Sequence, residues 1–254
     1  MTKLIALTLT KADFDRIPAD QRLFYFLAGQ LENDINILTN FLTIAINEVK
    51  LYAQQSPQRS AALAQVILLL KLTAGRLYEG HKMINENFSA KGFLNKYASE
   101  LSPNTLESLS KLNKYFGGKS AIQRIRTKFA FHLDAQSIAA AYANVPNDFT
   151  SVEYLSEKYA GHNLFHTSET LSIIAIIGNK LDKWQSALDS IVEEITDTCV
   201  TMGIFLSGVI GLILTKYLGV TNDRLMETEI TIADEAPIDA LRLPFFCLPP
   251  RTRG

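Results

Sequence analysis

Residues 27–58 read LAGQLENDINILTNFLTIAINEVKLYAQQSPQ, and this segment sets the architecture expected for the rest of the chain. Its apolar residues recur in steps of three and four at Leu27, Leu31, Ile35, Leu38, Leu42, Ala45, Val49 and Tyr52. Such steps place side chains on one face of a helix. Ser56-Pro57 then breaks the pattern, because proline is poorly tolerated inside a helix. We therefore expect a long helix that begins after Asp13, Asp15 and Pro18 and ends before Ser56.

The same spacing continues beyond the break, from about Gln58 to Phe88. The second stripe consists of Leu63, Ile67, Leu70, Ala74, Leu77, His81, Ile84 and Phe88. Two such helices joined by a short turn predict an antiparallel hairpin. His81 occupies an apolar position of this stripe, so we interpret it as a hydrogen-bonded core histidine rather than a functional one.

Shorter helices and a third long stripe follow the hairpin. Ser102 is placed to cap a helix that runs through Leu112. Ser168, followed by Glu169, is placed to cap the third stripe, which is either one helix or two helices end to end. This stripe consists of Ile174, Ile177, Leu181, Trp184, Leu188, Ile191, Ile195, Met202, Phe205, Val209 and Leu212.

Strand signals are few. Apolar residues flank Ala160-Gly161, which predicts at most a small β-hairpin near 154–167. Residues 227–232 alternate like one strand, and the prolines after them predict an extended C-terminal tail. The expected fold is therefore mainly α, a helical bundle built on long antiparallel helices. We expect one bundle domain over residues 1–220, and a short strand with an extended tail over 221–254.

Composition limits the classes of function. The chain has 254 residues, 47% of them hydrophobic, and a net charge of −1, which excludes a globally basic nucleic-acid binder. Cys199 and Cys247 are far apart and do not form a metal-type pair, which suits a reducing compartment. Met1–Thr10 lacks the long apolar run of a secretory signal. We therefore expect a cytoplasmic protein.

One stretch raises the question of a membrane. Thr198–Thr215 contains no charged residue across 18 positions, which is near the length of a membrane span. It continues in phase from an amphipathic helix, so we favour a central helix of a soluble bundle. Gly203, Ser207 and Gly211 within it are four residues apart, a spacing that allows close approach of helices. A membrane-associated protein anchored by 198–215 remains a minor alternative.

The local charge differs from the net charge between Glu107 and Asp134. No acidic residue lies between these two positions, whereas six residues there are cationic: Lys111, Lys114, Lys119, Arg124, Arg126 and Lys128. A local positive field attracts polyanions whatever the charge of the whole molecule. This part of the chain is therefore the candidate nucleic-acid contact.

Residues 125–134 read IRTKFAFHLD, with Arg126 followed after five residues by His132. This pattern resembles the motif of the HEPN superfamily, which are small all-helical proteins. The polar residue after the arginine is Thr127, where that family more often has asparagine, aspartate or histidine. The resemblance implies a metal-independent endoribonuclease that works as a homodimer, with two motifs facing one cleft. It also implies a bacterial defence or toxin–antitoxin context, with an antitoxin or another protein as partner.

The chemistry of the motif can be stated from the side chains themselves. Attack by a ribose 2′-hydroxyl needs a proton acceptor with a pKa near neutrality, which His132 would supply. Arg126 would hold the charge that builds on the phosphoryl oxygens, and Thr127 would orient either group or contact a phosphate. The residues expected to hold the RNA backbone are Lys119, Arg124 and Lys128. No metal and no cofactor is expected.

Two other interpretations of the motif stay open. On an ideal α-helix six residues separate Arg126 and His132 by roughly 120°, so a partner subunit or a helix end must bring them together. In the first, Arg126 and His132 bind a nucleic acid or a protein without catalysis. In the second, they only bridge helices in a helical dimer. His162 and His166 have a metal-like spacing, but Gly161 and the lack of a third ligand make zinc binding unexpected.

Overall fold

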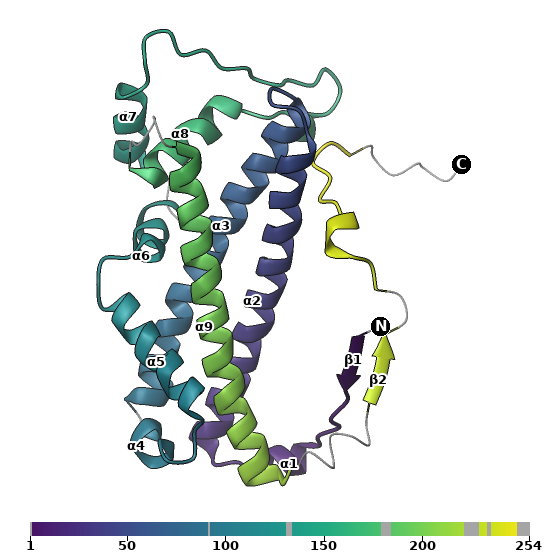
Figure 1. The fold of residues 1–254 in the computed structure, drawn as a ribbon, viewed down its shortest axis with the longest axis vertical. Coiled ribbons are helices and arrows are strands. Elements are labelled where there is room, and N and C mark those ends of the chain that lie inside the picture. The colour runs from purple at the N-terminus through teal and green to yellow at the C-terminus, as the bar shows by residue number, and fades with distance from the viewer. Residues whose placement is uncertain are drawn as a thin grey trace. The chain divides into compact units, whose positions relative to one another are not determined.

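The structure is a computed structural model that describes residues 2–90, 92–130, 134–178, 184–220, 229–232 and 235–247. Helices predominate, which confirms the mainly α class (Figure 1). The helices are α1 (Lys11–Asp15), α2 (Ala19–Leu51), α3 (Pro57–Ile84), α4 (Phe93–Tyr97), α5 (Pro103–Phe116), α6 (Ala121–Ile125), α7 (Ala135–Ala143), α8 (His166–Ile177) and α9 (Trp184–Leu218). Shorter turns are the π-helical η1 (Asn85–Ser89) and η2 (Arg126–Ala130) and the 3-10 turns η3 (Ala160–His162) and η5 (Ile238–Ala240). The strands are β1 (Thr2–Ile5) and β2 (Glu229–Ile232).

The predicted helical hairpin is present as α2 and α3. Leu31, Ile35, Leu42 and Ala45 of the first stripe are buried, and so are Ile67, Leu70, Ala74, Leu77, Ile84 and Phe88 of the second. The two helices approach closely, because a Cβ placed at Gly80 would lie 2.5 Å from Leu31 Cδ2. An ion pair between Arg76 and Asp34 also joins them. The three- and four-residue spacing therefore identified the buried faces correctly.

The chain divides into two compact units. Unit 1 comprises Met1–Ile37, Arg76–Ser120 and Thr196–Pro237, and unit 2 comprises Leu38–Gly75, Ala121–Ile195 and Ile238–Gly254. Aromatic rings fill the interior of unit 1, where the centroid of the Phe88 ring lies 5.4 Å from that of Phe24 and 5.2 Å from that of Phe205. The expectation of one domain over residues 1–220 stays a prediction.

The third stripe belongs to two helices. α8 begins at His166, before the predicted cap Ser168, and its N-cap Phe165 offers no side-chain hydrogen bond. It ends at Gly178, whose φ of 72° is left-handed and favours glycine. Leu188, Ile191, Ile195, Met202, Phe205 and Val209 of α9 are buried as the stripe predicts, and Leu181 lies outside the described residues.

The β structure is small. β1 and β2 pair antiparallel, with Thr2 opposite Ile232 and Ile5 opposite Glu229. β1 thus forms the partner of the strand predicted near 227–232. The hairpin predicted near 154–167 is reduced to a single antiparallel bridge between Tyr154 and Leu164.

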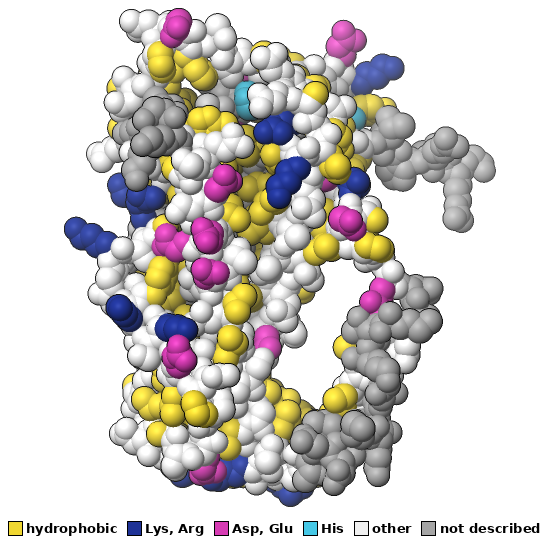
Figure 2. Space-filling view, viewed as in Figure 1, with side chains coloured by type: hydrophobic (Ala, Val, Ile, Leu, Met, Phe, Trp, Pro, Cys, Tyr) yellow, Lys and Arg dark blue, Asp and Glu magenta, His cyan; other side chains and the backbone are white. Residues whose placement is uncertain are grey.

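Two helical stretches are long and apolar enough to cross a membrane, judged by length and composition among the described residues. They are Pro57–Ser89 and Trp184–Leu218, whose most apolar 18-residue windows have mean hydropathies of 1.4 and 2.0. Only 39% of the most apolar window of the second stretch is buried, and hydrophobic side chains lie on the surface along α9 (Figure 2). Core helices of soluble proteins also pass this test, so the expectation of no membrane span stays a prediction.

Candidate functional site

The motif begins on α6 and continues through η2, both in unit 2. Glu194 Oε1 accepts a hydrogen bond of 3.0 Å from the backbone N–H of Ala121, which satisfies one of the free donors at the start of α6. Ile122, Ile125 and Phe129 are buried and anchor one side of the segment. The opposite side therefore carries the polar residues of the motif, with Arg126 half-buried.

The backbone at Arg126 is unusual. Residues Arg126–Ala130 form a π-helical turn, in which hydrogen bonds join residue i to residue i+5. Each turn therefore takes about one more residue than an α-helical turn, so the 120° separation expected for an ideal α-helix does not apply across this segment. Single π-helical turns are rare and occur frequently at functional sites. His132 lies outside the described residues, so its place relative to Arg126 stays a prediction.

The hydroxyl of Thr127 is used within its own helix. Its Oγ1 lies 2.8 Å from the carbonyl oxygen of Gln123 and 3.2 Å from that of Arg124. The carbonyl oxygens only accept, so the single hydroxyl hydrogen is donated to the backbone. A phosphate needs donors, and Thr127 can supply one only after breaking this bond.

Arg124, expected to contact RNA, caps a helix instead. Its Nη2 donates to the carbonyl oxygen of Ile176 at 2.5 Å, in the last turn of α8. A cation at the C-terminus of a helix satisfies free carbonyl groups and offsets the helix dipole. The side chain therefore has a structural partner that competes with a phosphate, and its role in RNA binding stays a prediction.

The two lysines of the predicted site occupy different units. Lys128 is exposed in unit 2, and its Nζ lies 3.5 Å from Asp134 Oδ2. Asp134 caps α7 and accepts hydrogen bonds from the backbone and side chain of Ser137. These bonds first, and the nearby Lys128 ammonium next, lower the pKa of the Asp134 carboxyl. Lys119 is exposed in unit 1, and its position relative to the other cations stays a prediction.

His81 is hydrogen-bonded, as expected, and it is half-buried rather than part of the core. It belongs to unit 1, its Nε2 lies 3.1 Å from Asn113 Oδ1, and its ring stacks on Phe116 with centroids 4.4 Å apart. Burial lowers the pKa of His81, and the hydrogen bond to Asn113 partly opposes this shift. The residue is thus held by an amide and an aromatic ring.

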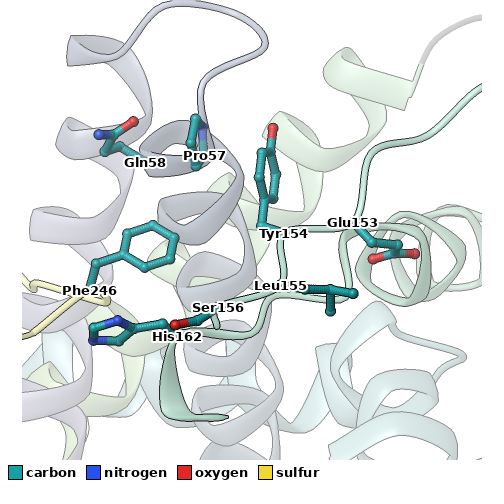
Figure 3. Close-up of a pocket in the computed structure, with 8 residues that line it drawn as sticks. All are labelled: Pro57, Gln58, Glu153, Tyr154, Leu155, Ser156, His162 and Phe246. Atoms are coloured by element: carbon teal, nitrogen blue, oxygen red, sulfur yellow. The ribbon is translucent and has the colours of Figure 1, made fainter. Parts of the chain in front are cut away.

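An open pocket of about 560 Å³ lies in unit 2 beside His162 (Figure 3). His162 Nε2 donates to the carbonyl oxygen of Cys247 at 2.6 Å, and Phe246 lies beside the imidazole ring. Glu153 accepts from the backbone N–H of Thr167 at 3.3 Å, and the Tyr154 hydroxyl donates to the carbonyl oxygen of Gln55 at 3.4 Å. The polar groups of this pocket thus hold the chain's own backbone. Among the described residues, no group of three metal-ligating side chains occurs.

Sequence reasoning missed three features of unit 2. The first two are helix caps, Glu194 at α6 and Arg124 at α8. Gly178 is a possible signal for the second cap, because glycine after an apolar run is a common helix stop. The third is a cavity of about 780 Å³. The helical pattern identifies buried faces but does not give the volume left between them.

Arg126, Thr127 and Lys128 are therefore neighbours on one π-helical turn, and Arg124 is directed to α8. Arg126 is half-buried and Lys128 is exposed, and each carries a cationic group of the kind that can bind a phosphate. Comparison of the chain with protein-family models, with curated proteins and with solved structures gave no match.

Proposed function

We propose that this protein is a HEPN-like RNA-binding protein and a metal-independent endoribonuclease, acting as a homodimer. The observation that carries the proposal is the Arg-x5-His motif of residues 126–132, whose arginine lies on a π-helical turn. The absence of acidic residues between Glu107 and Asp134 supports a polyanionic substrate. The mainly α fold with a long helical hairpin is compatible with the same family. A bacterial defence or toxin–antitoxin role, with an antitoxin as partner, follows from the resemblance alone.

In the proposed reaction, His132 takes the proton of a ribose 2′-hydroxyl as its oxygen attacks the adjacent phosphorus. The bond from phosphorus to the 5′-oxygen breaks, that oxygen takes a proton from water and leaves as a hydroxyl, and the other product is a 2′,3′-cyclic phosphate. Arg126 stabilises the negative charge that develops on the phosphoryl oxygens by donating two parallel hydrogen bonds. Lys128, whose Nζ lies 3.5 Å from Asp134 Oδ2 and 3.5 Å from Ser137 Oγ, contributes to holding the RNA backbone. The Thr127 hydroxyl keeps its bond to the helix backbone and so contributes less than the sequence predicts.

The test is cleavage of mixed RNA by the purified protein in excess chelator. We expect Arg126→Ala and His132→Ala each to lower the cleavage rate by about 10²-fold or more, because each removes a separate part of the transition-state stabilisation. Lys11→Gln is the matched charge control, since Lys11 pairs with Asp15 at 2.5 Å and lies outside residues 107–134. Its cleavage rate should remain within about twofold of the wild type.

The outcomes separate the competing functions. Loss of RNA binding in Arg126→Ala, in a protein that never cleaves RNA, would establish a non-catalytic RNA-binding protein. Equal cleavage by the wild type and both motif variants would contradict the assigned roles. RNA binding should weaken steeply as salt rises if phosphates make the contacts.

The alternative is a non-catalytic helical dimer that binds partners. One observation in unit 1 favours it: Val200 and Ile204 on α9 are 57% and 44% exposed. Between them, a Cβ placed at Gly203 would meet no atom within 4 Å. A second copy could pack closely on such a face. Light scattering should then report a dimer that Ile204→Glu converts to monomer, with no effect of His132→Ala on assembly.

A further inference from the structure

The cavity of about 780 Å³ in unit 2 is the strongest unassigned feature of the molecule. It is bounded by the C-terminal end of α2, the start of α3, α8, the start of α9 and residues 149–151. Its volume lies within the range of pockets that hold small ligands, roughly 300–1,000 Å³. The site does not depend on the Arg126 motif and would remain if the proposed ribonuclease function were wrong.

The buried lining of the cavity is mostly apolar, and its exposed lining is mostly polar. Its buried wall residues are mostly aliphatic: Val66, Ile173, Ile174 and Leu188, with Ser60. Its exposed lining residues are mostly polar and include Lys50, Gln54, Gln55, Gln185 and Asp189. An occupant that matches this gradient has an apolar body inside and a polar head at the opening.

The charge at the opening favours a negative head group. Lys50 and Arg59 line the cavity, against one carboxylate from Asp189. The Arg59 guanidinium is held in place, because its Nη1 donates to the carbonyl oxygen of Val49 at 2.5 Å. A fixed guanidinium retains further N–H groups that can bind a carboxylate in the bidentate manner.

The backbone of the lining has one feature that is typical of a binding site. Gln55, which lines the cavity, has a φ of 122°, which side-chain-bearing residues rarely adopt. Backbone strain of this kind clusters at ligand-binding sites.

We propose that this cavity binds a small molecule with an apolar body and one carboxylate, of the medium-chain fatty acid class. The hydrocarbon lies against Val66, Ile173 and Leu188. The carboxylate lies at the opening and is bound by Arg59 and Lys50. No covalent step is involved, and the ligand acts through binding alone.

Tryptophan fluorescence can detect binding to this cavity, because Trp184 is the single tryptophan of the chain and lines the site. Titration with decanoate below its micelle concentration should give a saturable blue shift of Trp184 emission, because the ring is 37% exposed before binding. Decanol and decylamine have the same chain length without the negative charge. We expect both to bind at least tenfold more weakly than decanoate.

Three variants test the assignment of the residues. Lys50→Gln removes an exposed cation of the opening and should weaken decanoate several-fold while leaving decanol unchanged. Lys158→Gln removes an exposed cation outside the lining and is the matched control. Leu63→Phe places a larger side chain in the cavity and should abolish the saturable shift. Far-UV circular dichroism of each variant checks that the helices are retained.

The proposal is overturned by any of three results. A linear, non-saturable response of Trp184 shows that the apolar chains adsorb without a site. Equal affinity for decanoate, decanol and decylamine shows that the cations do not select the head group. Retention of the full saturable response by a folded Leu63→Phe variant shows that the ligand lies elsewhere.

Discussion

The interiors of the two units differ in how completely they are filled. In unit 1 the rings of Phe24, Phe88 and Phe205 are each at most 1% exposed, and the Phe88 ring contacts both of the others. In unit 2 the aliphatic residues Val66, Ile174 and Leu188 border the cavity of about 780 Å³. Both units use segments of α2, α3 and α9, so the same helical periodicity supports a packed interior and a hollow one.

The difference shows that the size of the buried side chains, and not only the helical spacing of apolar residues, decides how completely an interior is filled. An aromatic ring buries roughly 150–250 Å², whereas an aliphatic side chain leaves more of the space between helices unfilled. A filled interior stabilises the fold, and a hollow one leaves room for a ligand. The aromatic cluster of unit 1 contributes packing, and the cavity of unit 2 leaves room for the proposed ligand.

The largest expected effect is on the free energy of unfolding, when a buried leucine is replaced by alanine in each unit. Leu77 of unit 1 is fully buried, and Leu77→Ala should lower the free energy of unfolding by about 4 kcal/mol. Leu188 already borders a cavity and has fewer contacts to lose, so Leu188→Ala should cost about 2 kcal/mol. Urea denaturation followed by circular dichroism measures both. Equal losses would contradict the comparison.

A pair of glycines on α9 sharpens the comparison within unit 1. A Cβ at Gly208 would lie 2.1 Å from Thr105 Oγ1 and 2.8 Å from its Cγ2, so Gly208→Ala should cost about 1–3 kcal/mol. A Cβ at Gly203 would meet no atom within 4 Å, so Gly203→Ala should gain about 0.5–1 kcal/mol. Thermal melting of both variants gives the result. A stabilised Gly208→Ala protein would show that α5 and α9 are not tightly packed there.

The smallest effect concerns pH and His81 in unit 1. Burial lowers the pKa of His81 below its usual value of 6.5, so the unfolded chain binds more protons between the folded-state pKa and 6.5. The contribution of His81 to stability is thus complete above pH 6.5 and is lost as the pH falls through this window. His81→Gln should flatten the dependence of melting temperature on pH between 5 and 7.5. An unchanged slope would show that other groups govern it.

The fold could be predicted wherever its cause was local. The stripe from Leu27 to Tyr52, the break at Ser56-Pro57 and the cap Ser102 each act within a few residues, and each is confirmed. The division between α8 and α9 was left undecided, because the apolar stripe stays in phase across Gly178. The pairing of β1 with β2 joins the two ends of the sequence, and no local pattern indicates it.

The residue types of the candidate site could be predicted from the sequence, but its backbone conformation and hydrogen bonds could not. The sequence identified Arg126 and its cationic neighbours, and it could not identify the π-helical turn that carries them. Arg124 and Thr127 were assigned to RNA because of their residue types. In the structure their donors bind backbone carbonyl groups, of α8 for Arg124 and of the motif helix itself for Thr127. Short motifs show which groups are present, whereas tertiary hydrogen bonds decide which are available.

The antiparallel ribbon of β1 and β2 has a consequence for biosynthesis. Thr2 leaves the ribosome early, but its partner Ile232 follows only after most of the chain has been made. At about 5–20 residues per second, β1 waits on the order of ten seconds or longer with its backbone groups unpaired. During translation this short strand is open to pairing with other nascent chains, a hazard that ends when residues 229–232 emerge.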